Sequence, residues 1–210
     1  LINWGAFVTK LVIKTDSIDV GHPTCYNKLN DVLAITSMDT WKAYYTFHLA
    51  DVFASDLSSK FVNASFNYGK TLSGQEQIKL RWERVYRVVD GNLGQALGEL
   101  YVDRYFNKDA KEKMLSLVNN LQKAFEERIL RVDWMSDSTK KIAVEKLHAF
   151  IKKIGYPDKW RDYSKVTINR NTYFDNLLSC SADQYQYELN KLGKPVDKTE
   201  WGMTPPTINA

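Results

Sequence analysis

The sequence is poor in cysteine and histidine, the residues on which disulfide-stapled folds and most zinc sites depend. Only two cysteines, Cys25 and Cys180, occur among 210 residues. This number excludes a disulfide framework and allows one disulfide at most. The three histidines are followed by Pro23, Leu49 and Ala149, never by glutamate. The H-E-x-x-H zinc signature is therefore absent from this chain.

Long apolar runs and blocks of one charge are also absent. No apolar run approaches the roughly 20 residues that a membrane-spanning helix needs. The formal net charge is +4, and it is spread along the chain without a run of about five or six like charges. We therefore expect no transmembrane segment in this chain and no nucleic-acid partner. The chain opens with Leu1 inside an apparent helical pattern, so we expect an upstream part that is not included.

What the sequence does contain is a repeated helical period in a composition that is 44% hydrophobic and 13% aromatic. Apolar residues recur three and four positions apart, as on one face of a helix. The pattern predicts a mainly α, multi-helix fold. The predicted helices cover the stripe from Trp4 to Val12, a segment opened by a Thr36/Asp39 capping box and continuing to Phe53, and about residues 75–106, 109–132, 137–154 and 172–192.

The segments between these helices are predicted from their glycines, prolines and polar residues. A polar loop contains Gly21 and Pro23, and Gly69 and Gly74 bracket a second loop. Gly155 is expected to cap the 137–154 helix, while Asn171 is expected to cap the start of the last one. Residues 159–170 read as a further loop.

The inward faces of the longer helices are predicted from their apolar stripes. In the helix opened by Thr36 these are Trp41, Tyr45, Leu49, Val52 and Phe53. In the 109–132 helix they are Met114, Leu117, Val118, Leu121, Phe125 and Ile129.

Two glycines inside the 75–106 helix need a structural explanation, because each lowers helix stability by about 1 kcal/mol relative to alanine. Gly94 and Gly98 are four residues apart and share one face. No Gly-Lys-Ser/Thr follows them, so a phosphate loop is disfavoured. We expect a close approach of another helix or backbone at this face.

The last residues are expected to be extended. Pro205 and Pro206 restrict the backbone before them to extended conformations. The β-branched Thr207 and Ile208 suit the beginning of a strand. The C-terminal segment is thus predicted to be the start of a strand.

Two residue pairs have the spacing of metal ligands. Glu145 and His148 form an E-x-x-H element like that of di-iron bundles, which requires two such elements and two further glutamates. His22 and Cys25 resemble half of a structural zinc site, which requires four ligands. Neither pair has the remaining ligands at a recognisable spacing. The favoured interpretation is an ordinary polar pair in each case.

Three arginines alternate with aromatic residues on one predicted helix. Arg81, Arg84 and Arg87 interleave with Trp82 and Tyr86. A basic stripe with aromatics is found in some nucleic-acid-binding domains. On an amphipathic helix the same pattern is a solvated face beside a buried one, which is the favoured interpretation.

No serine or cysteine lies in a sequence motif that identifies a general base and a residue to orient that base. No catalytic nucleophile is therefore assigned.

Several segments, in order, resemble one enzyme family. They are the Gly91-Asn92 pair with the following LGQALGELYVDRYF, the Asp133-Trp134-Met135 run with its Ser-Asp-Ser-Thr-Lys-Lys continuation, Ile154 to Asp158, Glu200-Trp201, and Ile208 to Ala210. Together they resemble the neprilysin-like zinc metallopeptidases, the family that includes neprilysin, endothelin-converting enzyme and bacterial PepO. Val85 stands where vertebrate members place a disulfide-forming cysteine, which points to a bacterial-type member.

The resemblance implies a role for this chain within a larger peptidase. In this family a mostly helical domain covers a thermolysin-like catalytic domain, which binds zinc through two histidines and a glutamate. It implies that this chain holds no catalytic residue and no metal ligand, and that zinc is a cofactor of the parent only. The family's Asn-Ala pair binds the backbone of the peptide substrate from an edge strand. Carried over, Asn209 and Ala210 are the expected substrate-binding residues.

The resulting functional hypothesis is a part of a zinc metalloendopeptidase that encloses peptide substrates and is inactive alone. Residues 1–157 are predicted to form the enclosing helical domain, and residues 158–210 a helix with an extended connector into the catalytic domain. By resemblance only, the parent is expected outside the cytoplasm, as a periplasmic, secreted or membrane-anchored protein. The alternative is a stand-alone helical binding or scaffold module without peptidase activity.

Overall fold

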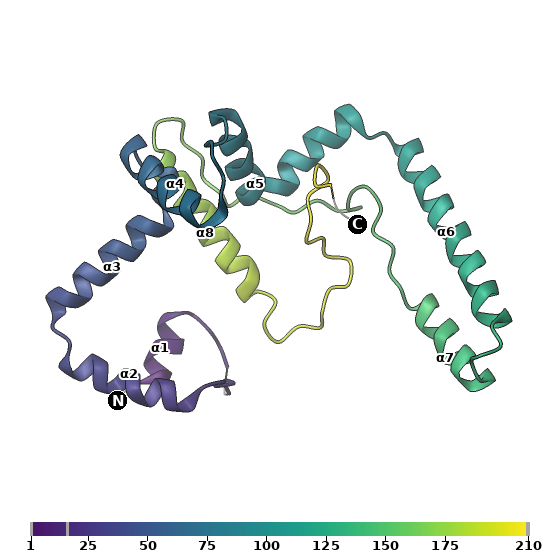
Figure 1. Cartoon of the computed structure of the whole chain (residues 1–210), viewed down its shortest axis with the longest axis horizontal. Coiled ribbons are helices and arrows are strands. Elements are labelled where there is room, and N and C mark those ends of the chain that lie inside the picture. The colour runs from purple at the N-terminus through teal and green to yellow at the C-terminus, as the bar shows by residue number, and fades with distance from the viewer. Residues whose placement is uncertain (1, 16, 209–210) are drawn as a thin grey trace. The chain divides into compact units, whose positions relative to one another are not determined.

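The structure is a computed structural model that describes residues 2–15 and 17–208. Within these residues the chain forms eight α-helices and one short 3-10 helix, without a β-strand (Figure 1). The helices are α1 Trp4–Lys10, α2 Pro23–Ile35, α3 Met38–Val52, η1 Ala54–Asp56, α4 Ser59–Ser73, α5 Arg81–Tyr105, α6 Lys108–Arg131, α7 Asp137–His148 and α8 Tyr173–Leu189. The mainly α prediction is confirmed.

The chain divides into two compact units, Leu1–Lys79 and Leu80–Ala210. The first contains α1 to α4, and the second contains α5 to α8 with the segments that join and follow them. The predicted division of this chain into residues 1–157 and 158–210 stays a prediction.

In the first unit two segments predicted as loops are helical. Pro23 begins α2 instead of ending a helix, because proline at the first helical position loses no hydrogen bond and already has the required φ. Gly69 lies inside α4, and only Gly74 ends that helix, in the left-handed conformation with φ of 72°. The Gly74 N–H donates to the Lys70 carbonyl at 2.9 Å.

The start of α3 was predicted one residue too early. Ser37, not Thr36, is the N-cap, and its hydroxyl accepts a hydrogen bond from the Thr40 N–H at 3.2 Å. Thr36 instead ends α2, through an N–H bond to the Val32 carbonyl. The C-cap of α2 and the N-cap of α3 are therefore adjacent residues, with no loop between the two helices.

In the second unit α5 begins at Arg81, six residues after the predicted start. The Glu83 carboxylate accepts the Leu80 N–H at 3.0 Å and fixes the helix start there. Leu93 has φ −129° and ψ 32°, so the helix is broken at this residue. The Asn92 side chain donates to the Val88 carbonyl at 2.8 Å, which satisfies one backbone acceptor beside the break.

Helices α6 and α7 lie side by side as an antiparallel pair (Figure 1). Ile129 and Leu147 are buried between the elements of this unit. Helix α7 ends at His148, six residues before the predicted end, and Gly155 is not its cap. Gln122 of α6 donates to the Leu147 carbonyl at 2.7 Å, so a distant side chain satisfies the end of α7 in place of a glycine cap.

The apolar stripes predicted to face inward are buried only in part. On α6, Ile129 is buried, while Leu121 and Phe125 remain 61% and 56% exposed. On α3, Leu49 and Val52 are 60% and 70% exposed. The periodicity marks the apolar face correctly, but the described residues of each unit supply too few neighbours to cover it.

Helix α8 packs on α5 and buries Leu177 and Cys180. Its N-cap is Thr172, not the predicted Asn171. The Asn171 N–H instead donates a hydrogen bond to Asn169 Oδ1 at 2.9 Å. The predicted loop over residues 159–170 has no helix or strand. Beyond α8, residues 190–208 run without a helix or strand and are called the connector below.

Candidate functional site

The connector lies against the glycine face of α5. Gly94 and Gly98 are both buried. A Cβ atom added at Gly98 would lie 2.5 Å from Pro205 Cδ, and one at Gly94 would overlap Thr204 Cγ2. The predicted close approach is confirmed, and the approaching segment is the connector, not a second helix. Any side chain larger than hydrogen would separate the connector from α5.

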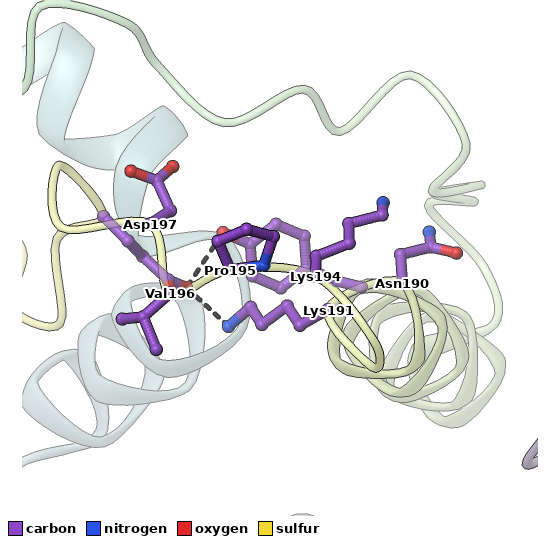
Figure 2. A pocket seen from close by; sticks show the side chains of 8 residues that line it. Asn190, Lys191, Lys194, Pro195, Val196 and Asp197 are labelled. Carbon is purple, nitrogen blue, oxygen red and sulfur yellow. Dashed lines mark hydrogen bonds and ion pairs between the residues drawn. The ribbon is translucent and has the colours of Figure 1, made fainter. Parts of the chain in front are cut away.

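A cavity of about 360 Å³ is lined by Tyr187 of α8 and by connector residues between 190 and 200 (Figure 2). Lys194 and Pro195 form the turn at its edge, after Gly193 with φ of 72°. Asp197 accepts the Thr199 N–H at 2.8 Å and the Thr199 hydroxyl at 2.7 Å. These bonds lower the pKa of Asp197, the hydroxyl bond having the larger effect. They fix the connector in a tight turn just before Glu200.

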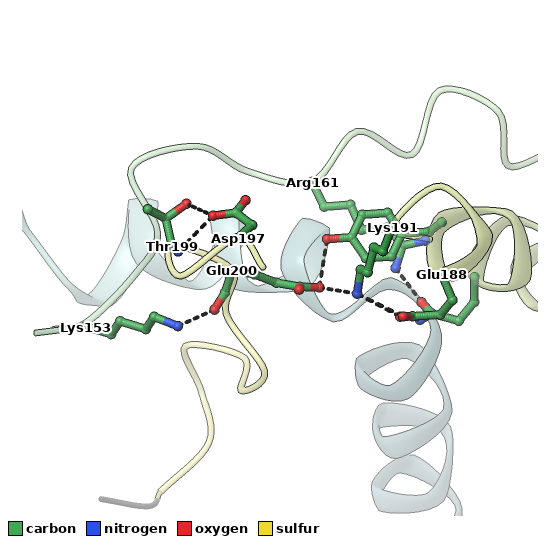
Figure 3. Close-up of polar contacts among 9 residues, drawn as sticks. Lys153, Arg161, Glu188, Lys191, Asp197, Thr199 and Glu200 are labelled. Atoms are coloured by element: carbon green, nitrogen blue, oxygen red, sulfur yellow. Dashed lines mark hydrogen bonds and ion pairs between the residues drawn. The ribbon is translucent and has the colours of Figure 1, made fainter. Parts of the chain in front are cut away.

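Glu200 attaches the connector to α8 (Figure 3). Its Oε1 accepts from Lys191 Nζ at 2.5 Å and from the Tyr187 hydroxyl at 2.9 Å. Its backbone carbonyl accepts from Lys153 Nζ. The hydrogen bond from Lys191 lowers the pKa of Glu200, and the Tyr187 hydroxyl lowers it further. Burial, then the bond to Glu200, raises the pKa of Tyr187.

Arg161 joins the loop after α7 to both α8 and α5. Its guanidinium binds Asp183 at 2.6 Å and Gln184 at 2.5 Å, and both members of the Arg161–Asp183 pair are only 13% exposed. Its backbone N–H donates to Gln95 Oε1 at 2.9 Å. The guanidinium also lies over the Tyr187 ring, 4.2 Å from the ring centre. This residue therefore fixes the relative positions of the elements on which the connector rests.

A second cavity, of about 550 Å³, lies where the break of α5, α8 and the connector meet. Two polar atoms of its lining residues, Asp90 Oδ1 and Arg161 Nε, are buried without a protein hydrogen-bond partner. Because buried polar atoms are normally paired, these two are available to water or a ligand. The site can hold and orient polar groups, but it has no nucleophile paired with a base.

The Glu200 contacts predict that docking of the connector weakens in acid. The pKa of Glu200 lies below its ordinary value of 4.5 when the connector is docked. Docking therefore gains stability above that value and loses it as the pH falls through the lowered pKa. We expect the wild type to melt above Glu200→Gln at neutral pH, and the two melting temperatures to converge as the pH falls below 4.5 and through the lowered pKa of Glu200. A difference that stays constant over this range would contradict the assignment.

The predicted substrate-binding residues, Asn209 and Ala210, lie outside the described residues. The description ends at Ile208, two residues after Pro206. Thr207 forms no strand; its N–H donates to the Thr204 carbonyl at 2.9 Å. The role of Asn209 and Ala210 stays a prediction.

The two candidate metal pairs are not brought to further ligands. His148 Nε2 lies 2.8 Å from Glu126 Oε2 of α6, so it links α6 to α7. Cys25 is exposed and Cys180 buried, and both are free thiols. Burial raises the pKa of Cys180. In the part of the chain that the structure describes, no three His, Cys, Asp or Glu side chains come together to hold a metal. These residues do not fit a zinc site.

The remaining sequence candidates are the three arginines near the start of α5, of which Arg84 has a buried Nε without a hydrogen-bond partner. Arg84 is half-buried, and Arg81 and Arg87 are exposed, as expected for the edge of an amphipathic helix. The expected lack of a nucleic-acid partner stays a prediction. None of the described helices is both long and apolar enough to cross a bilayer.

Sequence reasoning missed the residues that hold the connector, namely Arg161, Asp183, Tyr187 and Lys191. Lys191 and Glu200 are nine residues apart, and Arg161 and Asp183 are 22 apart. Pairs at these separations leave no periodic signal. The only local signal was the glycine pair of α5, which predicted a close neighbour but not its identity.

The sequence profile, the similar proteins and the similar solved structure all indicate the same family. The sequence profile of Peptidase family M13 matches residues 1–157. Neprilysin-2 of Drosophila melanogaster is 30% identical over 95% of this chain, which spans 28% of that protein. Membrane metallo-endopeptidase-like 1 of Mus musculus is 28% identical over 99% of this chain, which spans 29% of it.

A solved structure agrees with these sequence matches. The open state of the Mycobacterium tuberculosis zinc metalloprotease Zmp1 superposes with a TM-score of 0.85 and 38% identity, covering 99% of this chain and 33% of Zmp1. The chain thus spans about a third or less of each of these relatives. The resemblance to neprilysin-like peptidases is confirmed. The chain belongs to Peptidase family M13, whose profile covers three-quarters of its length.

Proposed function

We propose that this chain is the substrate-enclosing helical part of a zinc metalloendopeptidase. The observation that carries the proposal is the docked connector, which is fixed to α5 and α8 just before the expected substrate-binding pair. Pro205 and Thr204 fill the glycine face, which fixes these two residues against α5. A substrate-binding strand requires such a fixed start.

Asn209 and Ala210 are proposed to bind the peptide backbone. An edge strand offers free N–H and C=O groups to an extended peptide, and the asparagine amide adds a donor and an acceptor. Residues 1–157 are proposed as the enclosing domain, with residues 158–210 leading into the catalytic domain. On the basis of the family, we propose that the zinc is bound by the catalytic domain of the parent.

The relatives' names support the substrate class and the cofactor. One is named an endopeptidase of membranes and another a zinc metalloprotease. We accordingly propose peptides as substrates and a location outside the cytoplasm for the parent. The physical role of this part is to hold and shield the peptide while the catalytic domain cleaves it.

The test compares the 210-residue chain with the parent protein that contains it, using a fluorogenic peptide. We expect cleavage by the parent, its loss with a chelator, and no cleavage by the chain alone. Asn209→Ala in the parent is expected to raise KM at least about tenfold, because a lost backbone-binding group costs about 1.4 kcal/mol or more. Chelator-sensitive cleavage by the isolated chain would refute the proposed division of roles. A parent without peptidase activity would favour the scaffold alternative.

A further inference from the structure

A third cavity, of about 400 Å³, lies between α6, residues 151–159 and the connector. Four lysines and one aspartate line it, an excess of three positive charges. The lysines are Lys111, Lys152, Lys153 and Lys159. This concentration is unlike the rest of the chain, whose net charge is only +4 over 210 residues.

One of these lysines, Lys111, forms an ion pair with a carboxylate. Lys111 Nζ lies 2.8 Å from Asp158 Oδ1, and this contact lowers the pKa of Asp158. Lys152 donates to the amide oxygen of Asn119 at 2.6 Å. Lys153 donates to the backbone carbonyl of Glu200. Both acceptors are neutral, but the Asp197 carboxylate also interacts with Lys153, so the positive charge of the lining is offset only in part.

The same cavity has apolar walls. Leu115 and Ile151 line it from α6 and from the segment after α7, and Trp201 lines it from the connector. Apolar walls beside fixed charges strengthen the local field, because less water screens it. A ligand that suits both features combines an oxyanion with an apolar group.

We propose that this cavity binds a small organic anion, a carboxylate or phosphate attached to an apolar body. The lysines bind the oxyanion, while Leu115, Ile151 and Trp201 contact the apolar part. Since Thr199 and Trp201 belong to the connector, the bound ligand also holds the connector to α6. The proposal concerns a site separate from the peptide-binding pair and does not depend on peptidase activity.

The test is a titration of the 210-residue chain with hexanoate, hexyl phosphate and inorganic phosphate at constant ionic strength, followed by NMR. We expect saturable shifts of the amides of residues 151–159 and of the Trp201 indole N–H. Hexyl phosphate is expected to bind more tightly than inorganic phosphate, because only the former buries apolar surface. Comparison of hexanoate with hexyl phosphate identifies the preferred oxyanion.

Two double variants with the same net charge separate a site from general attraction. Lys152→Ala with Lys159→Ala removes two lining charges and is expected to weaken hexyl phosphate binding by about tenfold or more. Lys123→Ala with Lys141→Ala removes two exposed charges outside the cavity and is expected to leave binding within about twofold. Equal losses in both variants, or shifts that never saturate, would overturn the proposal.

Discussion

Replacing Arg161 with alanine is expected to lower the free energy of unfolding by about 2–3 kcal/mol, at the lower end of what breaking a buried ion pair costs, because the pair with Asp183 is largely but not fully buried. The loss is large because the Asp183 carboxylate would lose its ion-pair partner at a position only 13% exposed. Gln184 and the rings of Tyr163 and Tyr187 would lose their contacts with the guanidinium as well. Urea unfolding of the two proteins measures the difference.

Three further variants make this expectation specific. Arg161→Met combined with Asp183→Leu should recover much of the loss, because no uncompensated charge then remains buried. Arg161→Lys should be intermediate, since an ammonium cannot replace the planar fork that binds Asp183 and Gln184 together. Arg131→Ala breaks an exposed pair with Glu127, 77% and 65% exposed, and should cost less than about 0.5 kcal/mol. A similarly small cost for Arg161→Ala would show that the pair is not effectively buried.

Substituting alanine for Gly98 is expected to destabilise the chain, against the usual preference for alanine in a helix. Propensity alone would favour alanine by about 1 kcal/mol. The new Cβ, however, would lie 2.5 Å from Pro205 Cδ and 2.9 Å from Pro205 Cγ. The proline ring cannot rotate away, so the connector must move. We expect a net loss of about 1–3 kcal/mol in urea unfolding and faster proteolysis within residues 190–208.

Gly91→Ala is the matched control in the same helix. Nothing lies within 4 Å of a Cβ placed there, so this variant should be neutral or slightly stabilising. A stabilising Gly98→Ala would mean that Pro205 does not rest on α5. In the parent protein, and only if the proposed function holds, Gly98→Ala should also raise KM for a peptide, because the displaced connector carries Asn209 and Ala210.

The helical class was predictable because the apolar period of 3.6 residues is strong in most segments. The errors in the predicted helix boundaries occur where two local sequence rules give opposite predictions. Pro23 and Gly69 were read as breaks, although proline is tolerated at the first helical position and a single glycine inside a helix. The end of α7 was misplaced because Gln122, 25 residues away from Leu147, satisfies its last turn. No local pattern reports such a partner.

The candidate site was predictable only in outline. The shared face of Gly94 and Gly98 indicated a close neighbour, and the family resemblance indicated Asn209 and Ala210. The contacts that hold the connector were not predictable, because Arg161 and Asp183 are brought together by the packing of α8 on α5. Likewise, the lysines of the third cavity converge from α6 and from the segment after α7.

The contact between Gly98 and Pro205 also has an evolutionary consequence. Since the two residues share one small volume, a change at either alters which changes the other tolerates. A mutation that replaces Pro205 with a smaller residue would make alanine at position 98 acceptable, whereas the reverse order passes through a destabilised intermediate. The order of substitution is therefore constrained, and the history of the connector is tied to that of a helix about a hundred positions earlier in the chain.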